Sequence, residues 1–483
     1  MAEQPVTTRR DNPAWWQAVL FPAMAGGLGW GIRGQYGHET GAMIAGLLVS
    51  LTLALLLCPR ASSLSVARAV AWATVAMGFG GTMTYGQTIG LTQNPGMIGN
   101  WEALSWGMLG LAIKGGIWIG FTGVFLGMGV GGVRYRPLEV LLLMLGLLGA
   151  YFLGALLLNS PFDPEHRRLP WIYFSATWYW EPNATALEPR PESWGGLLFA
   201  LATAIVYSGV RRKDGLALRM ALWGLLGGIL GFPGGQCLQA FHAWNPELFR
   251  SGLWTWLDPN MNWWNWMETT FGAIMGGALG LGLWLNRARI RMLADSDVPV
   301  SSGAVGAILL SAHLALLIGS EIMDIPAISS FYDLGLIMGV IPLVAIAGGR
   351  FWPYLAILPI TMLPIAYKTV FELVDEKAAI SPVAGWTVYF VAPMLLVSAA
   401  AVWFRLKAAE GQDGRTFACD ALLLCVWMYW FLNFAFFRYS WPWTTWTNRT
   451  PNGIIFAVFA VALTAMAWKL RRLPVPEPAD HEN

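Results

Sequence analysis

The sequence predicts an all-α, polytopic membrane protein. Of its 483 residues, 56% are hydrophobic and only 12% are charged, whereas about 25% of the residues of a soluble domain are charged. The mean hydropathy is +0.52. Apolar stretches long enough to cross a bilayer recur along nearly the whole chain. A chain of this composition needs lipid as its solvent, and helices are the way in which such stretches satisfy their backbone groups there.

Fourteen apolar segments of spanning length are expected, each about 20 residues long. In chain order they cover 15–32, 38–58, 66–85, 103–132, 137–158, 194–210, 216–241, 266–285, 302–320, 332–348, 351–371, 383–405, 418–437 and 453–470. The 28 tryptophans and 55 glycines fit this class, because Trp favours membrane interfaces and Gly lets helices approach closely. The GxxxG spacings of Gly116 with Gly120 and of Gly276 with Gly280 therefore predict close helix packing.

Basic clusters mark alternate connections between these segments and predict the topology. The connections carry Arg9, Arg60, Arg134, Arg211, Arg287, Arg350, Arg405 and Lys469. By the positive-inside rule this side is cytoplasmic, so both termini are inside, and we expect a bacterial inner membrane. The resulting organisation is a cytoplasmic N-terminus (1–14), one transmembrane domain (15–472) and a disordered cytoplasmic tail (473–483). The outer loop 159–193 is long enough to form a small external cap.

Several classes of chemistry have no support in the sequence. The motifs GxxxxGK[ST], HExxH and GxSxG are absent, which argues against a P-loop ATPase, a zinc protease and a serine hydrolase. The four cysteines form no CxxC pair, so neither a metal site nor a disulfide framework is expected. No basic patch with interleaved aromatic residues predicts a nucleic-acid partner. We expect no cofactor, and the sequence singles out no catalytic residue.

The stretch 26–48 holds the first group of candidate binding residues. Arg33, His38 and Glu39 lie within seven residues of one another among closely spaced glycines. Ionisable side chains at membrane depth usually line a cavity or pathway. Arg33 would then anchor an anion, and His38 or Glu39 would carry a proton. The alternative is an ion pair between the ends of adjacent helices, with His38 as a cap.

Three glycine-rich hairpins resemble one another in this sequence. Their corners are Gly34-Gln35, Gly86-Gln87 and Gly235-Gln236, and their descending helices start near Glu39, Glu102 and Glu268. One hypothesis is that these carboxylates and amides converge on an outward-facing vestibule, because tandem hairpins build transport sites from broken helices. The simpler interpretation is that glutamate in a first helical turn complements the helix dipole.

Lys114 is the single strongest candidate for a functional charge. It lies about 18 Å below Glu102 if the helix is continuous, and a lysine at that depth is costly unless it is paired. Glu102, or a carboxylate of another hairpin, is a possible partner. Another alternative is that the helix breaks at Gly115 and Gly116. The alternative is a lysine that reaches the outer interface along its own apolar stem.

Four further polar residues border the second and third hairpins. They are Gln87, Asn100, Gln236 and His242. Each could hydrogen-bond a polar ligand or cap a helix, and their spacing does not distinguish these roles.

These observations lead to one functional hypothesis and two alternatives. We expect a multi-pass carrier for a small polar or amphiphilic substrate, with coupling to protons as an option. The first alternative is a membrane-embedded transferase that acts on a lipid-linked substrate at the outer face. The second is a non-catalytic subunit of a membrane complex. Membrane lipids are partners in every case, and a homo-oligomer or partner subunits remain open.

Overall fold

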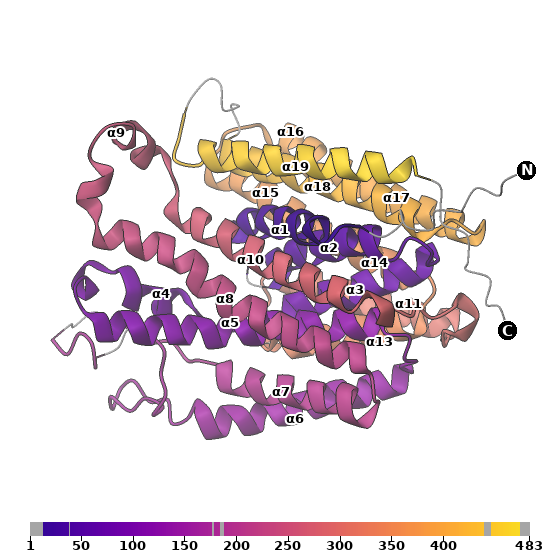
Figure 1. Cartoon of the computed structure of the whole chain (residues 1–483), viewed down its shortest axis with the longest axis horizontal. Helices are drawn as coiled ribbons and strands as arrows, with labels where there is room; N and C mark the ends of the chain where they lie inside the picture. Colours follow the sequence, from indigo (N-terminus) through magenta and orange to yellow (C-terminus); the bar gives the residue numbers. More distant parts are fainter. Residues whose placement is uncertain (1–12, 38, 176–177, 184–187, 439–445, 474–483) are drawn as a thin grey trace, which may run out of the picture.

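The computed structural model describes residues 13–37, 39–175, 178–183, 188–438 and 446–473. These residues form helices and connecting loops, and no β-strand occurs among them (Figure 1). Most long helices run along a similar direction, as in a bundle that crosses a bilayer. The predicted all-α class is therefore confirmed for the part of the chain described.

The helices follow one another with short connections. The first six are α1 (Trp15–Ile32), α2 (Glu39–Leu57), α3 (Ser63–Phe79), α4 (Gly86–Gln93), α5 (Trp101–Val130) and α6 (Pro137–Leu158). The next seven are α7 (Trp194–Ile205), α8 (Gly215–Trp244), α9 (Trp254–Leu257), α10 (Trp263–Leu285), α11 (Gly303–Glu321), α12 (Pro326–Tyr332) and α13 (Gly335–Gly348). The last six are α14 (Trp352–Ile357), α15 (Pro359–Phe371), α16 (Pro382–Trp386), α17 (Ala392–Ala409), α18 (Gly414–Arg438) and α19 (Thr450–Arg471).

Two closely packed helix pairs form the centre of the bundle. Helix α5 packs along α8, α1 packs along α10, and α8 and α10 are neighbours. A Cβ atom at Gly228 of α8 would lie 1.9 Å from the carbonyl oxygen of Gly115 on α5. At Gly280 of α10 it would lie 1.8 Å from the carbonyl oxygen of Ala18 on α1. The close packing that glycine spacing predicted is thus present, because no side chain fits between these backbones.

Helices at the edge of the bundle expose apolar side chains. In the most apolar stretch of α2, 94% of the residues are buried, whereas only 28% are buried in the corresponding stretch of α6. The exposed residues of α6 include Leu138, Leu142, Leu145, Phe152, Leu153, Leu156 and Leu157. An exposed leucine face of this length is unfavourable in water and suits contact with lipid tails. This pattern supports an integral membrane protein.

The predicted count of fourteen spans is not confirmed. Ten helices of the described residues are long and apolar enough to cross a membrane, and the bent pair α12 and α13, which meet at 79°, brings the number to eleven. The remaining three predicted spans correspond to the helices α1, α3 and α10. Helix α3 has only 17 residues, and α1 and α10 include glycines, tryptophans and polar residues that lower their apolarity.

The three glycine-glutamine corners do not adopt one common structure, so a hairpin repeat is not confirmed. Gly34-Gln35 lies in a 3₁₀ turn, Gly86-Gln87 begins α4, and Gly235-Gln236 lies inside the continuous helix α8. Glycine permits each of these conformations, so shared composition does not impose shared geometry. The starts of α5 and α10 do agree: their N-cap asparagines, Asn100 and Asn262, each accept a backbone N–H bond of 3.0 Å.

The loops that carry basic clusters meet at one end of the bundle. The Arg291 amide donates to the Val130 carbonyl at 2.9 Å, and the Gly414 amide donates to the Ala61 carbonyl at 2.7 Å. The Arg212 guanidinium donates to the Arg134 carbonyl at 2.6 Å. We call this the basic end. The predicted segments 1–14 and 473–483 lie almost entirely outside the described residues.

The predicted outer cap, 159–193, is described at 159–175, 178–183 and 188–193, and it packs on α4 and α5. The indole Nε1–H of Trp106 donates to the Tyr173 carbonyl at 2.9 Å. The amide of Gln87 donates to the Glu188 carbonyl at 2.6 Å. The loop is therefore fastened to the helices by side chains of the second hairpin.

Candidate functional site

Arg33 lies where α1 stops inside the bundle. Helix α1 ends at Ile32, a 3₁₀ turn covers Arg33–Gln35, and α2 begins at Glu39. The guanidinium lies 5.3 Å from the ring centre of Trp118, which is near the middle of the 30-residue helix α5. Only 3% of Arg33 is exposed. The charge therefore lies within the helical layer, where an ionisable group is costly unless it has a partner.

Residues from the other two hairpins surround Arg33. The Nη2 atom of Arg33 donates to the hydroxyl of Tyr85, which directly precedes α4. The Nε atom lies 4.0 Å from Oε1 of Glu268 on α10, and this carboxylate is also buried. That distance permits electrostatic attraction but exceeds a hydrogen bond. The structure thus brings together Arg33 and Glu268, two of the residues predicted from sequence.

The hydrogen-bonding capacity of Arg33 is only partly used. Its guanidinium lies 4.9 Å from the ring centre of Trp30 and 5.4 Å from that of Tyr85, in addition to the contact with Trp118. Aromatic faces stabilise a cation but accept no strong hydrogen bond. The Nε and Nη1 atoms are buried and have no hydrogen-bond partner among the described residues. The unused donors point to an anionic oxygen as their natural partner.

Amide side chains support the broken end of α1. Asn265 donates to the Gly31 carbonyl at 2.5 Å and to Glu268 at 3.3 Å. Asn433 of α18 donates to the Ile32 carbonyl at 3.2 Å. These bonds satisfy carbonyls that a helix end leaves without partners. A cavity of ≈ 10 Å³ beside them, also lined by Arg449, has room for about one water.

Lys114 forms a second buried ion pair, with a partner that the sequence did not indicate. Its Nζ atom lies 2.5 Å from Oε1 of Glu192, and neither side chain is exposed. Nζ also donates to the Thr84 carbonyl at 2.6 Å and to the Thr88 hydroxyl at 2.8 Å. Helix α5 is continuous through Gly115 and Gly116, so neither a helix break nor an exposed lysine occurs. All three ammonium protons have acceptors.

Glu192 is equally well satisfied. Its Oε2 accepts the backbone N–H of Phe174 at 2.9 Å, and its Oε1 accepts the hydroxyl of Ser175 at 3.0 Å. The pair therefore joins α5 to the middle of the outer loop, at Phe174 and Ser175, and to its C-terminal end, at Glu192. Since no donor of Lys114 is left for a ligand, we assign this pair to the architecture of the loop. Glu102, the predicted partner, lies exposed in the first turn of α5.

The remaining carboxylate of the first hairpin belongs to a separate group. Glu39 is the first residue of α2 and is half-buried. Lys368 lies nearby, 2.6 Å from Oε2 of Glu321 and 3.2 Å from the Tyr36 carbonyl that it also contacts. Lys368 is thus the ion-pair partner of Glu321. His38 lies outside the described residues.

The predicted amides make structural contacts. Gln87 holds the outer loop, since its Oε1 also accepts the Arg190 amide at 3.2 Å, and Asn100 caps α5. Gln236 is buried and donates to the Thr92 hydroxyl at 2.7 Å, but its Oε1 has no partner among the described residues. These three amides therefore do not join Arg33 and Glu268 in one ligand shell. The predicted vestibule of three carboxylates and three amides stays a prediction, because the side chain of Gln35 lies outside the described residues and Gln87, Gln236 and Glu268 have separate partners.

His242 forms an aromatic and ionic group at the end of α8. Its Nε2 atom lies 2.8 Å from Oδ1 of Asp258, and its ring stacks on Trp263 with 4.2 Å between ring centres. Trp263 also donates to Asp258 at 2.8 Å. Among the described residues no group of three or more histidine, cysteine, aspartate or glutamate side chains is arranged to hold a metal ion.

Sequence reasoning missed most of the residues around Arg33. Trp30, Tyr85 and Trp118 were not predicted from the sequence, although each contacts the guanidinium. Asn265 and Asn433 belong to helices far from Arg33 in the chain. The one sequence feature that indicates a buried hydrogen bond is an asparagine in an otherwise apolar helix, such as Asn433. This feature does not identify the partner of the hydrogen bond.

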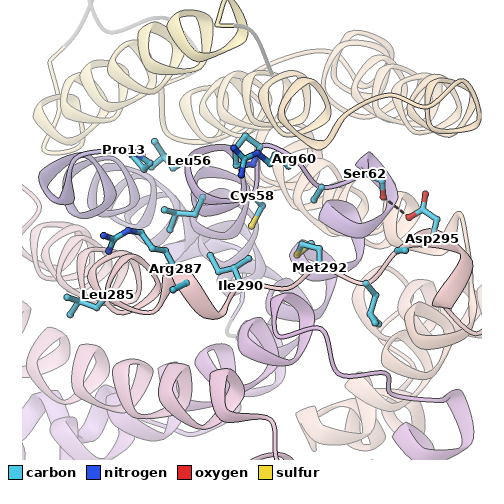
Figure 2. A pocket seen from close by; sticks show the side chains of 16 residues that line it. Pro13, Leu56, Cys58, Arg60, Ser62, Leu285, Arg287, Ile290, Met292 and Asp295 are labelled. Carbon is cyan, nitrogen blue, oxygen red and sulfur yellow. Dashed lines mark hydrogen bonds between the residues drawn. The ribbon is translucent and has the colours of Figure 1, made fainter. Parts of the chain in front are cut away.

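A larger cavity lies at the basic end, away from these residues. It measures ≈ 1000 Å³ and lies between the ends of α2 and α10 and the loop 286–295. Figure 2 shows Arg60 and Arg287 among its lining side chains, and the hydrogen bond from Ser62 to Asp295 at its edge. Helix α2, with 19 residues, separates the two regions by about 28 Å. None of the predicted site residues lines this cavity.

Comparisons with known proteins give no further guide to the site. No protein-family model, no curated protein and no solved structure matches the chain.

Proposed function

We propose that this protein is a multi-pass membrane carrier for a small anionic substrate, which binds at Arg33. The observation that carries this proposal is the buried guanidinium of Arg33, whose Nε and Nη1 atoms have no hydrogen-bond partner among the described residues. Leaving donors of a buried charge unused is costly. An anion bound in front of them would supply the missing acceptors.

The helix break at Arg33 supports a carrier over a purely structural charge. Carriers use the ends of interrupted helices to bind substrates within the membrane, and here α1 ends at Ile32 beside the middle of α5. The adjacent cavity of ≈ 10 Å³ is too small for a substrate. The described conformation therefore corresponds to a closed state, and substrate would enter when the helices separate.

Glu268 could couple the transport of the substrate anion to the movement of protons in the proposed carrier. Its carboxylate competes for the same guanidinium at 4.0 Å. Protonation of Glu268 would release Arg33 for the substrate anion, and departure of the anion would restore the ion pair. Substrate and proton would then bind together. We place the basic end in the cytoplasm of a bacterial cell on the positive-inside rule.

Transport by reconstituted protein tests this proposal. Liposomes containing the full-length protein and a pH-sensitive dye inside would be exposed to a panel of small carboxylates, phosphates and sulfonates. The proposal expects at least one anion to enter together with protons in wild type, and not in Arg33→Gln. Conversion of a lipid-linked substrate without net flux would favour the transferase alternative. A stable co-purifying protein without flux or conversion would favour a complex subunit.

A further inference from the structure

A second buried arginine lies at the basic end of the bundle and forms no direct ion pair with the described residues. Arg68 of α3 is 9% exposed, and its Nε and Nη2 atoms have no hydrogen-bond partner among the described residues. No carboxylate of the described residues lies within ion-pair distance of the Arg68 guanidinium. A buried charge of this kind costs several kcal/mol unless it is compensated.

Arg68 faces a small cavity that presents a second unused donor. The cavity measures ≈ 30 Å³, and its lining includes Arg68, Trp72, Ser65, Gly129 and Tyr135. The indole Nε1–H of Trp72 is buried and has no hydrogen-bond partner among the described residues. A volume of about 30 Å³ is enough for at least one water molecule or for one monatomic anion.

The other polar groups around this cavity are already engaged. The carboxylate that acts electrostatically on Arg68 is Asp295, which accepts the hydroxyls of Ser62 at 2.6 Å and Ser65 at 3.2 Å; Figure 2 shows the first of these bonds. The hydroxyl of Tyr135 donates to Asp214 at 3.0 Å. Arg350 adds a second positive charge to the surroundings of Arg68. The groups without partners around this cavity are therefore donors.

We propose that this cavity binds one halide ion, chloride under physiological conditions, between Arg68 and the indole of Trp72. A halide accepts hydrogen bonds and needs no donor of its own, whereas a water molecule would also require acceptors. The bound ion neutralises Arg68 and joins α3 to α5 and to the loop 291–301. This site is independent of Arg33, which lies at the other end of α2.

Thermal unfolding of the full-length protein in detergent tests the halide site. Chloride or bromide is titrated against gluconate at constant ionic strength. Wild type is expected to show a saturable rise in Tm of about 2 °C or more, and Arg68→Met no rise. Arg60→Met, which removes an exposed arginine of the same end, should respond like wild type.

Two further measurements test the halide site if Arg68→Met does not fold. Trp72→Phe keeps an aromatic ring but removes one donor, so the half-saturating halide concentration should increase roughly tenfold. Crystals grown in bromide should show an anomalous peak in the cavity. An equal Tm rise in gluconate, an unchanged response in Trp72→Phe, or a water molecule without an anomalous peak at the cavity would overturn the proposal.

Discussion

The guanidinium of Arg33 and the carboxylate of Glu268 face each other at 4.0 Å, and their side chains are only 3% and 8% exposed. Arg33 directly follows α1 and Glu268 lies on α10, and these two helices pack along each other through glycines. A tight salt bridge would satisfy both groups, but this pair is too long for a hydrogen bond. The relationship leaves both charges available to other partners, and the proposed transport cycle depends on that availability.

Glu268→Gln should strengthen anion binding and abolish coupling to protons. The change keeps the shape of the side chain but removes the charge that competes for Arg33. Two unit charges 4 Å apart interact by about 4 kcal/mol at an effective dielectric constant of 20, so we expect at least a tenfold gain in anion affinity. Anion titration of the purified protein and dye-monitored proton uptake measure the two effects. Glu102→Gln, at an exposed position, should change neither, and unchanged affinity in Glu268→Gln would contradict the competition model.

Lys114→Met should destabilise the protein strongly, because it leaves Glu192 as a buried charge without its partner. Breaking a buried pair costs about 3–5 kcal/mol. The double change Lys114→Met with Glu192→Leu should recover most of this loss. Thermal unfolding measures both, and Lys407→Met supplies the control, since its pair with Glu410 is exposed and contributes at most about 1 kcal/mol. If Lys114→Met lost anion binding while keeping its Tm, Lys114 would instead be a ligand residue.

Gly228→Ala should separate α5 from α8 and lower stability. The added methyl group would meet the Gly115 carbonyl oxygen at 1.9 Å, so backbones must move, at a cost of about 1–3 kcal/mol or more. Gly146→Ala on α6 is the matched control, because no atom lies within 4 Å of its Cβ position. That change should stabilise the helix by about 0.5–1 kcal/mol. Equal unfolding temperatures for the two variants would argue against the packed α5 and α8 interface.

Cysteine labelling should place the basic end and the outer loop on opposite sides of the membrane. In a Cys237→Ser background the remaining natural cysteines are buried. Arg60→Cys should react with an impermeant maleimide only in inverted vesicles. Trp171→Cys, whose position is 96% exposed, should react in intact cells. Reaction of both from the same side would show that the number of crossings between them differs from our topology.

Composition and apolar periodicity were enough to predict the helical class and the position of nearly every long helix. The count of fourteen spans is not confirmed, because the length or apolarity of α1, α3 and α10 falls below that of the ten described helices that are long and apolar enough to cross a membrane. These three helices pack largely against protein, so their sequences tolerate glycine and polar residues. A helix buried by other helices does not need the apolarity that lipid contact demands.

The candidate site was only partly predictable from sequence. Arg33 and Glu268 stood out because charges are rare in apolar segments, and the structure brings them together. The partner of Lys114 could not be inferred, because Glu192 lies 78 residues away in a polar loop where a carboxylate is unremarkable in itself. Tertiary packing determines which charged residues of distant segments form an ion pair, and local sequence patterns do not predict it.

The most direct test of the central claim is a thermal-shift titration of wild type, Arg33→Gln and Arg60→Gln with the same panel of small carboxylates, phosphates and sulfonates, at a fixed saturating chloride concentration. We predict that at least one anion raises the Tm of wild type and of Arg60→Gln in a saturable manner, and has no effect on folded Arg33→Gln. An anion that stabilises all three proteins equally, or a complete lack of stabilisation across the panel, would contradict the assignment of Arg33 as the substrate anchor.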